Sequence, residues 1–114
     1  MPKNRKGLYE GMYILSATLS EDSRKKAFEK ITEGIVQKGG EIHKTHEQGR
    51  RRLAYEIDGK REGIYYTLFF TAPTSAISDL WKDYQLHEDL IRFMTIKVEK
   101  VQETLEFASI KPQA

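Results

Sequence analysis

Apolar side chains recur at helical spacing between residues 21 and 38, so this stretch is predicted to form a helix. Four of them fall on one helix face: Ala27, Phe28, Ile31 and Ile35. The sequence Thr18-Leu-Ser-Glu21 has the spacing of a capping box, in which the Thr18 hydroxyl would accept a hydrogen bond from the first turn. Gly39 and Gly40 follow the pattern, and glycine tolerates the left-handed conformation common just past a helix end.

A second helix is predicted after Pro73, which ends the stretch before it. Thr74 or Ser75 can cap this helix. Its apolar positions stand at i, i+3, i+4 and i+7: Ile77, Leu80, Trp81 and Tyr84. The helix is therefore expected to be amphipathic.

Four other stretches have the alternation and composition typical of strands: residues 8–15, 42–57, 64–72 and 90–98. The second of them changes parity, because Ile42 is an even position whereas the apolar residues Leu53, Tyr55 and Ile57 are odd. If all four belong to the core, one extra residue must be absorbed between them, and Gly49 is the natural place for a β-bulge. Residues 58–63 then form the turn of a hairpin.

The resulting order is strand, helix, strand, strand, helix, strand. It predicts an α+β ferredoxin-like split β-α-β sandwich, with a four-stranded antiparallel sheet and both helices on one face. The other sheet face is then open, and an exposed apolar face favours a binding partner. The side chains predicted to contact that partner are Tyr65, Phe69, Tyr9 and Met12.

Length and composition fit this single domain. The chain has 114 residues, of which 39% are hydrophobic and 32% charged. It has no cysteine, which excludes disulfides, thiolate ligands and a thiol nucleophile and favours a reducing compartment. No apolar run approaches the length of a membrane span, so no membrane association is expected. Residues 1–7 form a basic tail, residues 8–98 the domain and residues 99–114 a second tail.

The net charge of +2 conceals an asymmetry. Residues 1–57 carry 12 Lys and Arg against 8 acidic residues, whereas residues 58–114 carry 7 against 9. The basic residues also cluster, at Lys3, Arg5 and Lys6 and in the triplet Arg50, Arg51 and Arg52. Such clusters attract phosphate because binding releases condensed counterions. A solvated surface is the alternative interpretation.

Specific residues also resemble a known family, the bacterial small-subunit ribosomal protein six. They are Tyr9-Glu10, Gly49-Arg-Arg-Arg-Leu-Ala-Tyr-Glu-Ile57, Gly63 and Arg92-Phe-Met-Thr-Ile-Lys97. The resemblance covers about residues 9–98, with Arg51-Arg-Leu-Ala-Tyr55 as its most specific piece. Glu56 departs from the family pattern, which commonly has proline there, so the strand is expected to continue more regularly.

The resemblance implies a non-catalytic constituent of the small ribosomal subunit, located in the cytoplasm within the ribosome. Such a protein binds small-subunit (16S) ribosomal RNA together with small-subunit protein eighteen, as a heterodimer, in subunit assembly and translation. No cofactor, metal or small-molecule substrate is implied. A net charge close to zero predicts that the chain alone binds RNA weakly and depends on its partner.

The residues predicted to contact RNA are Arg92, Lys97, Arg50, Arg51, Arg52, Lys3, Arg5 and Lys6. Guanidinium groups suit phosphate because their planar fork can form two hydrogen bonds to it. Alternate strand residues face opposite ways, so at most two of the three consecutive arginines are expected to meet one phosphate track. Their alternative partners are Glu47, Glu56 or the partner protein.

Two other functions share this element order. An RNA-recognition motif stacks bases on aromatics of its third strand, where Tyr65 and Phe69 lie, but its basic-glycine-aromatic-glycine signature is absent from residues 61–69. An acylphosphatase-like hydrolase or a ligand-binding module would need a phosphate cradle or an acid and base pair, which the sequence lacks. His43 and His46 face opposite sides of a strand unless a bulge intervenes, and His87 is expected in a polar loop.

Overall fold

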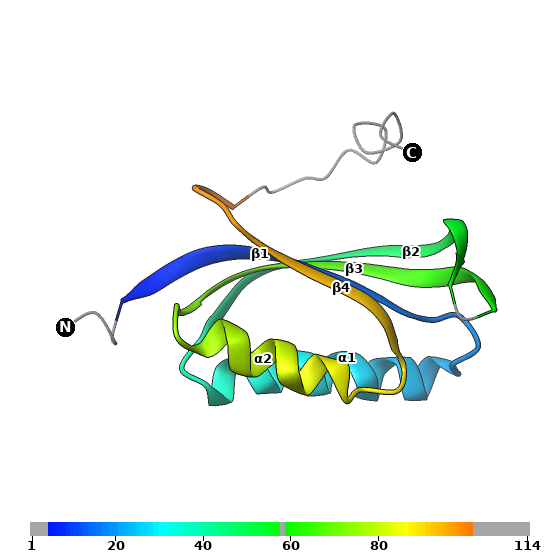
Figure 1. Ribbon diagram of the computed structural model, residues 1–114, viewed down its shortest axis with the longest axis horizontal. Coiled ribbons are helices and arrows are strands. Elements are labelled where there is room, and N and C mark those ends of the chain that lie inside the picture. The colour runs from blue at the N-terminus through cyan, green and yellow to red at the C-terminus, as the bar shows by residue number, and fades with distance from the viewer. Residues whose placement is uncertain (1–4, 58, 102–114) are drawn as a thin grey trace.

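The protein is described here by a computed structural model that covers residues 5–57 and 59–101. Its elements, in chain order, are β1 (Lys6–Ser16), α1 (Glu21–Gln37), β2 (Glu41–Ile57), β3 (Lys60–Pro73), α2 (Ala76–Gln85) and β4 (Leu90–Lys97). The strands form one antiparallel sheet in the order β2-β3-β1-β4. Both helices cover the same face of that sheet, which confirms the predicted ferredoxin-like fold (Figure 1).

The ends of the domain differ slightly from the prediction. β1 begins at Lys6, so Lys6 and Gly7 belong to the sheet rather than to a tail. Lys3 and residues 102–114 lie outside the described residues. In the described part of the chain, neither helix is long and apolar enough to cross a membrane.

α1 begins one residue after Ser20, whose side chain caps it. The Ser23 amide donates to Ser20 Oγ over 3.1 Å. The predicted capping role of Thr18 is wrong, because the first helical residue is Glu21 and the Thr18 hydroxyl is instead hydrogen-bonded to Ser16 Oγ at 2.8 Å. At the other end Gly39 has a φ of +91°, as expected for a residue just past a helix.

The hydrophobic core lies between the two helices and the face of the sheet that they cover. Its largest members include Tyr13 and Leu15 of β1, Ile31 and Ile35 of α1, Leu68 and Phe70 of β3, and Leu80 and Tyr84 of α2. Burial of apolar area on this scale is the main stabilising term of so small a domain. The predicted apolar faces of both helices are thereby confirmed, although Trp81 lies at the edge, where its indole N–H donates to Thr95 Oγ1 over 3.1 Å.

β2 carries two bulges before its arginine triplet, and this corrects one expectation. Its register against β3 shifts at Gly49, as predicted, and also between Ile42 and Lys44. Each extra residue reverses the parity, so two of them restore it, and the odd position in the triplet, Arg51, lies on the open face. Tyr55, expected in the core, is therefore 63% exposed, and Leu53 is buried outside the main core.

A third irregularity follows the triplet. Arg52 pairs with Glu62, but the next pair along the ladder is Ile57 with Lys60, so β2 carries several extra residues there. The absence of proline at position 56 had suggested that the strand continues regularly there. The strand does reach Ile57, but its pairing with β3 is irregular between Arg52 and Ile57. This bulged end carries Tyr55 across the open face.

Candidate functional site

The β2–β3 hairpin and the turn after β1 lie at the same end of the sheet (Figure 1). Basic side chains gather in a cleft between them. We call it the hairpin cleft. It has a volume of about 530 Å³ and is lined by Ser16, Ala17, Thr18, Arg50, Arg52, Gly59, Lys60, Arg61 and Glu62. Two arginines of the triplet thus share one face of β2. Sequence reasoning missed Lys60 and Arg61, because it placed both in the hairpin turn.

Arg50 is fixed in this cleft by two acceptors. Its guanidinium donates to Glu62 Oε1 over 3.1 Å and to the Ala17 carbonyl oxygen over 3.0 Å. Neither of the carboxylates proposed from the sequence is its partner, since Glu47 pairs with Arg24 and Glu56 with Arg61. Arg50 therefore ties the hairpin to the turn after β1.

Arg51 lies on the other side of β2 from Arg50 and Arg52. It pairs across the ladder with Gly63 and is partly buried. The expected alternation is confirmed, and the triplet divides between the two faces of the sheet.

The two basic residues predicted on the last strand lie on opposite faces of the sheet. Arg92 pairs with Ile14 and lies on the open face, whereas Lys97 pairs with Tyr9 and lies on the helix-covered face. The Arg92 guanidinium carbon is 5.8 Å from the centre of the Tyr55 ring, within cation–π distance. The bulged end of β2 thus reaches over the sheet to Arg92.

The basic residues at the start of the chain lie at the opposite end of β1 from the hairpin cleft. Arg5 and Lys6 are exposed beside the start of α2, where the Thr74 amide donates to the Arg5 carbonyl oxygen over 3.0 Å. β1 has 11 residues, so it separates these cations from Ser16 in the cleft by roughly 35 Å. Those predicted RNA-contacting residues that fall within the described part of the chain therefore form separate positive regions and not one patch.

Two of the four residues predicted to contact a protein partner are buried. Tyr9 is 8% exposed and packs in the core against Phe70, because it shares a face of β1 with Tyr13; its assignment to the partner-facing surface is wrong. Phe69 does lie on the open face, but it is only 1% exposed, and the His46 ring lies edge-on to it at 5.9 Å. Neither ring is available to a partner.

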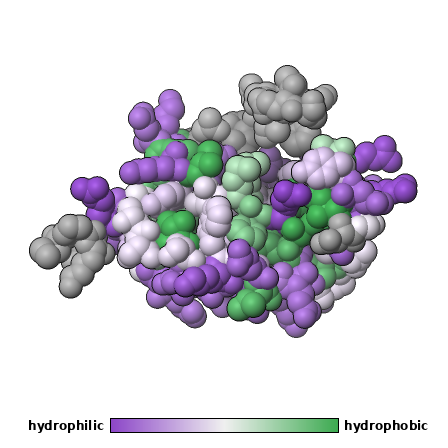
Figure 2. Space-filling model, in the orientation of Figure 1, coloured by the Kyte–Doolittle hydropathy of each residue, from purple (hydrophilic) through white to green (hydrophobic). Residues whose placement is uncertain are grey.

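An apolar stripe nevertheless runs across the open face. We call it the open-face stripe, and it consists of Met12, Ile14, Tyr65, Met94 and Ile96, all of them partly or largely exposed. Met94 and Ile96 are 52% and 44% exposed. Figure 2 views the molecule from the β4 side, past the edge of the sheet, and shows hydrophobic side chains in several groups among hydrophilic ones.

Met94 and Ile96 were not among the predicted partner contacts. The signal for them was present, because β4 carries apolar residues on both of its faces. For an edge strand this pattern indicates that the second face also needs cover. Burial also raises the pKa of the Tyr65 hydroxyl in this stripe.

The bulge at residue 43 brings His43 and His46 to the same face. His43 is hydrogen-bonded to Thr71 Oγ1, and His46 lies against Phe69, both on the open face. Nearby, burial raises the pKa of the Glu10 carboxyl, and His46 opposes that shift. Across residues 5–57 and 59–101, no three His, Asp or Glu side chains come close enough together to hold a metal ion.

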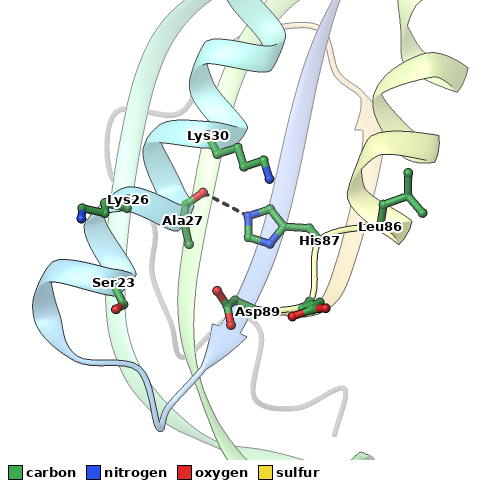
Figure 3. Close-up of a pocket in the computed structure, with 8 residues that line it drawn as sticks. Ser23, Lys26, Ala27, Lys30, Leu86, His87 and Asp89 are labelled. Carbon is green, nitrogen blue, oxygen red and sulfur yellow. Dashed lines mark hydrogen bonds between the residues drawn. The ribbon is translucent and has the colours of Figure 1, made fainter.

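His87 lies in a second cleft, between α1 and the loop before β4 (Figure 3). Its Nε2 is 3.4 Å from the Ala27 carbonyl oxygen, and Lys30 and Asp89 line the same space. The ring therefore joins the loop to α1. The cleft shows no nucleophile beside an activating base among its lining residues, and it supports a structural role for His87.

The sequence and the fold both match known proteins. The family model described as ribosomal protein S6 matches residues 8–97. The chain is 60% identical over 113 residues to small ribosomal subunit protein bS6 of Protochlamydia amoebophila, covering 99% of each chain. It is 56% identical over 110 residues to the protein of that name from Chlamydia muridarum, covering 96% of this chain and 98% of that one. A crystal structure of 30S ribosomal protein S6 from Thermotoga maritima matches with a TM-score of 0.77 and 25% identity, covering 96% of this chain and 95% of that one.

Proposed function

The chain belongs to the ribosomal protein S6 family of the small ribosomal subunit, and from this premise we propose that it binds 16S ribosomal RNA as a heterodimer with small-subunit protein eighteen. Its role is then in subunit assembly and translation, in the cytoplasm. The family match over residues 8–97 is the observation that carries the proposal. The family is one of structural proteins, so no catalytic step is assigned.

The open-face stripe is the surface proposed to receive the protein partner. Met94 and Ile96 leave about half of their side-chain surface in water. An apolar patch that stays exposed in a monomer costs free energy, and covering it with a partner recovers that cost at about 25 cal/mol per Å². The central strands of this face add Met12 and Tyr65 to the same surface.

The distribution of charge supports RNA binding by a pair of proteins. The positive regions lie at opposite ends of the sheet, and the chain as a whole carries only +2. Each region alone can neutralise few phosphates, and affinity for nucleic acid rises with the number neutralised. A basic partner on the open face would add phosphate contacts between these regions.

The partner surface is tested by placing a charge in the stripe. Met94→Glu should weaken the heterodimer at least tenfold, because a carboxylate would be buried against an apolar partner. Val36→Glu is the matched control, since Val36 is 54% exposed but lies on α1, away from the stripe. Titration calorimetry with purified protein eighteen measures both. Equal affinity of the two variants would overturn the assignment of this face.

A further inference from the structure

The hairpin cleft gathers four cationic side chains: Arg50, Arg52, Lys60 and Arg61. Two of them are compensated by carboxylates. Arg50 pairs with Glu62 at 3.1 Å, and Arg61 pairs with Glu56 at 3.3 Å. Both pairs are solvent-exposed, so they contribute little to stability, but they fix where these side chains lie.

Arg52 and Lys60 are the other two. Within residues 5–57 and 59–101, neither forms an ion pair. The ladder places them on neighbouring strands of the hairpin, with Arg52 opposite Glu62 on β3 and Lys60 opposite Ile57 on β2. Two uncompensated cations lining one cleft raise the positive potential there, and an anion that enters is attracted to both.

The opposite wall of the cleft is polar and pre-formed. Ser16 Oγ and Thr18 Oγ1 are hydrogen-bonded at 2.8 Å, and the Thr18 amide donates to Ser16 Oγ over 3.3 Å. This wall is tied to the hairpin by Arg50, which donates to the Ala17 carbonyl oxygen. The cleft is therefore held open by contacts that do not use Arg52 or Lys60.

We propose that the hairpin cleft binds a backbone phosphate of ribosomal RNA, held by the Arg52 guanidinium and the Lys60 ammonium. The proposal rests on the proposed function, since it names where the chain contacts that RNA. The Arg52 fork supplies paired N–H donors and Lys60 a point charge, the two usual ways of holding a phosphate. Arg50 is a positioning residue, because one N–H on each of its terminal nitrogens is already bonded to Glu62 or Ala17 and holds the guanidinium against the wall of the cleft.

The test removes these two charges and keeps the side-chain stems. Arg52→Gln/Lys60→Gln is compared with Lys26→Gln/Lys30→Gln, which removes the same charge from α1 beside the second cleft. Each variant is mixed with protein eighteen, and its binding to 16S ribosomal RNA is measured over a range of salt concentrations. The cleft variant should bind about tenfold more weakly near 0.1 M salt, with a slope of log K against log salt smaller by about one unit. The α1 variant should keep the wild-type slope.

Three outcomes would overturn the proposal. The first is an unchanged salt slope in the cleft variant. The second is an equal loss in both variants, which would show an effect of net charge alone. The third is loss of heterodimer formation by the cleft variant while its thermal unfolding is unchanged, which would assign the cleft to the protein interface. Failure of the wild-type pair to bind the RNA would instead refute the proposed function, and this proposal with it.

Discussion

Two tyrosine hydroxyls are hydrogen-bonded to each other in the core, and their contribution to the stability of the fold can be tested directly. Tyr13 of β1 and Tyr84 of α2 share a hydrogen bond of 2.9 Å. Their rings also meet edge to face, with centres 5.3 Å apart. Tyr13 has no exposed surface, so its hydroxyl has no access to water.

Replacing Tyr84 by phenylalanine removes one hydroxyl and leaves the ring. The Tyr13 hydroxyl would then be buried without this partner, which costs about 1–3 kcal/mol. For a domain of this size that change lowers the melting temperature by roughly 5–15 °C. Thermal and urea unfolding followed by circular dichroism measure it. Tyr55→Phe is the matched control, because that ring is exposed, and it should change stability by less than about 0.5 kcal/mol.

The double variant Tyr13→Phe/Tyr84→Phe separates the hydrogen bond from the packing. With both hydroxyls gone, no polar group is left unsatisfied, so much of the loss should be recovered. A single variant as stable as the wild type would refute this account of the core. So would a double variant whose loss equals the sum of the two single losses, because the hydroxyls would then not be coupled.

Three further predictions concern stability. Gly63→Ala should destabilise the fold by about 1–3 kcal/mol in urea unfolding, because its Cβ would clash with Ile14 Cγ2. Gly34→Ala would place its Cβ at an ordinary contact distance of 3.9 Å from Leu80 and should gain about 0.5–1 kcal/mol; similar values for both variants would contradict this. Ser20→Ala should cost about 1 kcal/mol by removing the N-cap of α1, and a neutral effect would show that the cap contributes nothing. Burial raises the pKa of Tyr84 to about 12, so an unfolded chain releases this proton near pH 10 while the folded chain keeps it. The free energy of unfolding should therefore not depend on this group below about pH 10 and should fall by up to about 3 kcal/mol towards pH 12. Tyr84→Phe should reduce that fall.

The element order could be predicted because periodicity and turn residues agree along most of the chain. Ala27, Ile31 and Ile35 mark α1 by their spacing alone, and all three are buried. The first residue of α1, Glu21, was predicted correctly, but its cap was assigned to Thr18, since several hydroxyl residues precede Glu21 and only geometry selects Ser20. Local pattern thus located the helix, but it did not decide which of the preceding hydroxyls caps it.

The candidate site was harder to predict, because bulges reverse the side chains after them. Gly49 indicated one bulge in β2, but nothing distinctive in the sequence marks the one at His43. The face of Tyr55 was therefore assigned wrongly. Lys60 was missed for a related reason, since the hairpin turn is shorter than expected and its last residues join β3.

Side-chain contacts between segments far apart in the sequence could not be predicted either. The carboxylates considered for Arg50 as alternatives to RNA were Glu47 and Glu56, which are near it along the chain. It bonds instead to Glu62 and to the carbonyl of Ala17. Tyr9 was assigned to a partner surface although it shares its parity with the core residue Tyr13. Strand alternation alone would have placed it correctly.

The most direct test of the proposed function compares 16S ribosomal RNA binding by three samples: this chain, protein eighteen, and an equimolar mixture. The mixture should bind at least tenfold more tightly than this chain alone at physiological salt, with a steeper dependence on salt, because the pair neutralises more phosphates. Tight binding by the isolated chain, unchanged by the partner, would contradict the proposal that it acts on RNA as one half of a heterodimer.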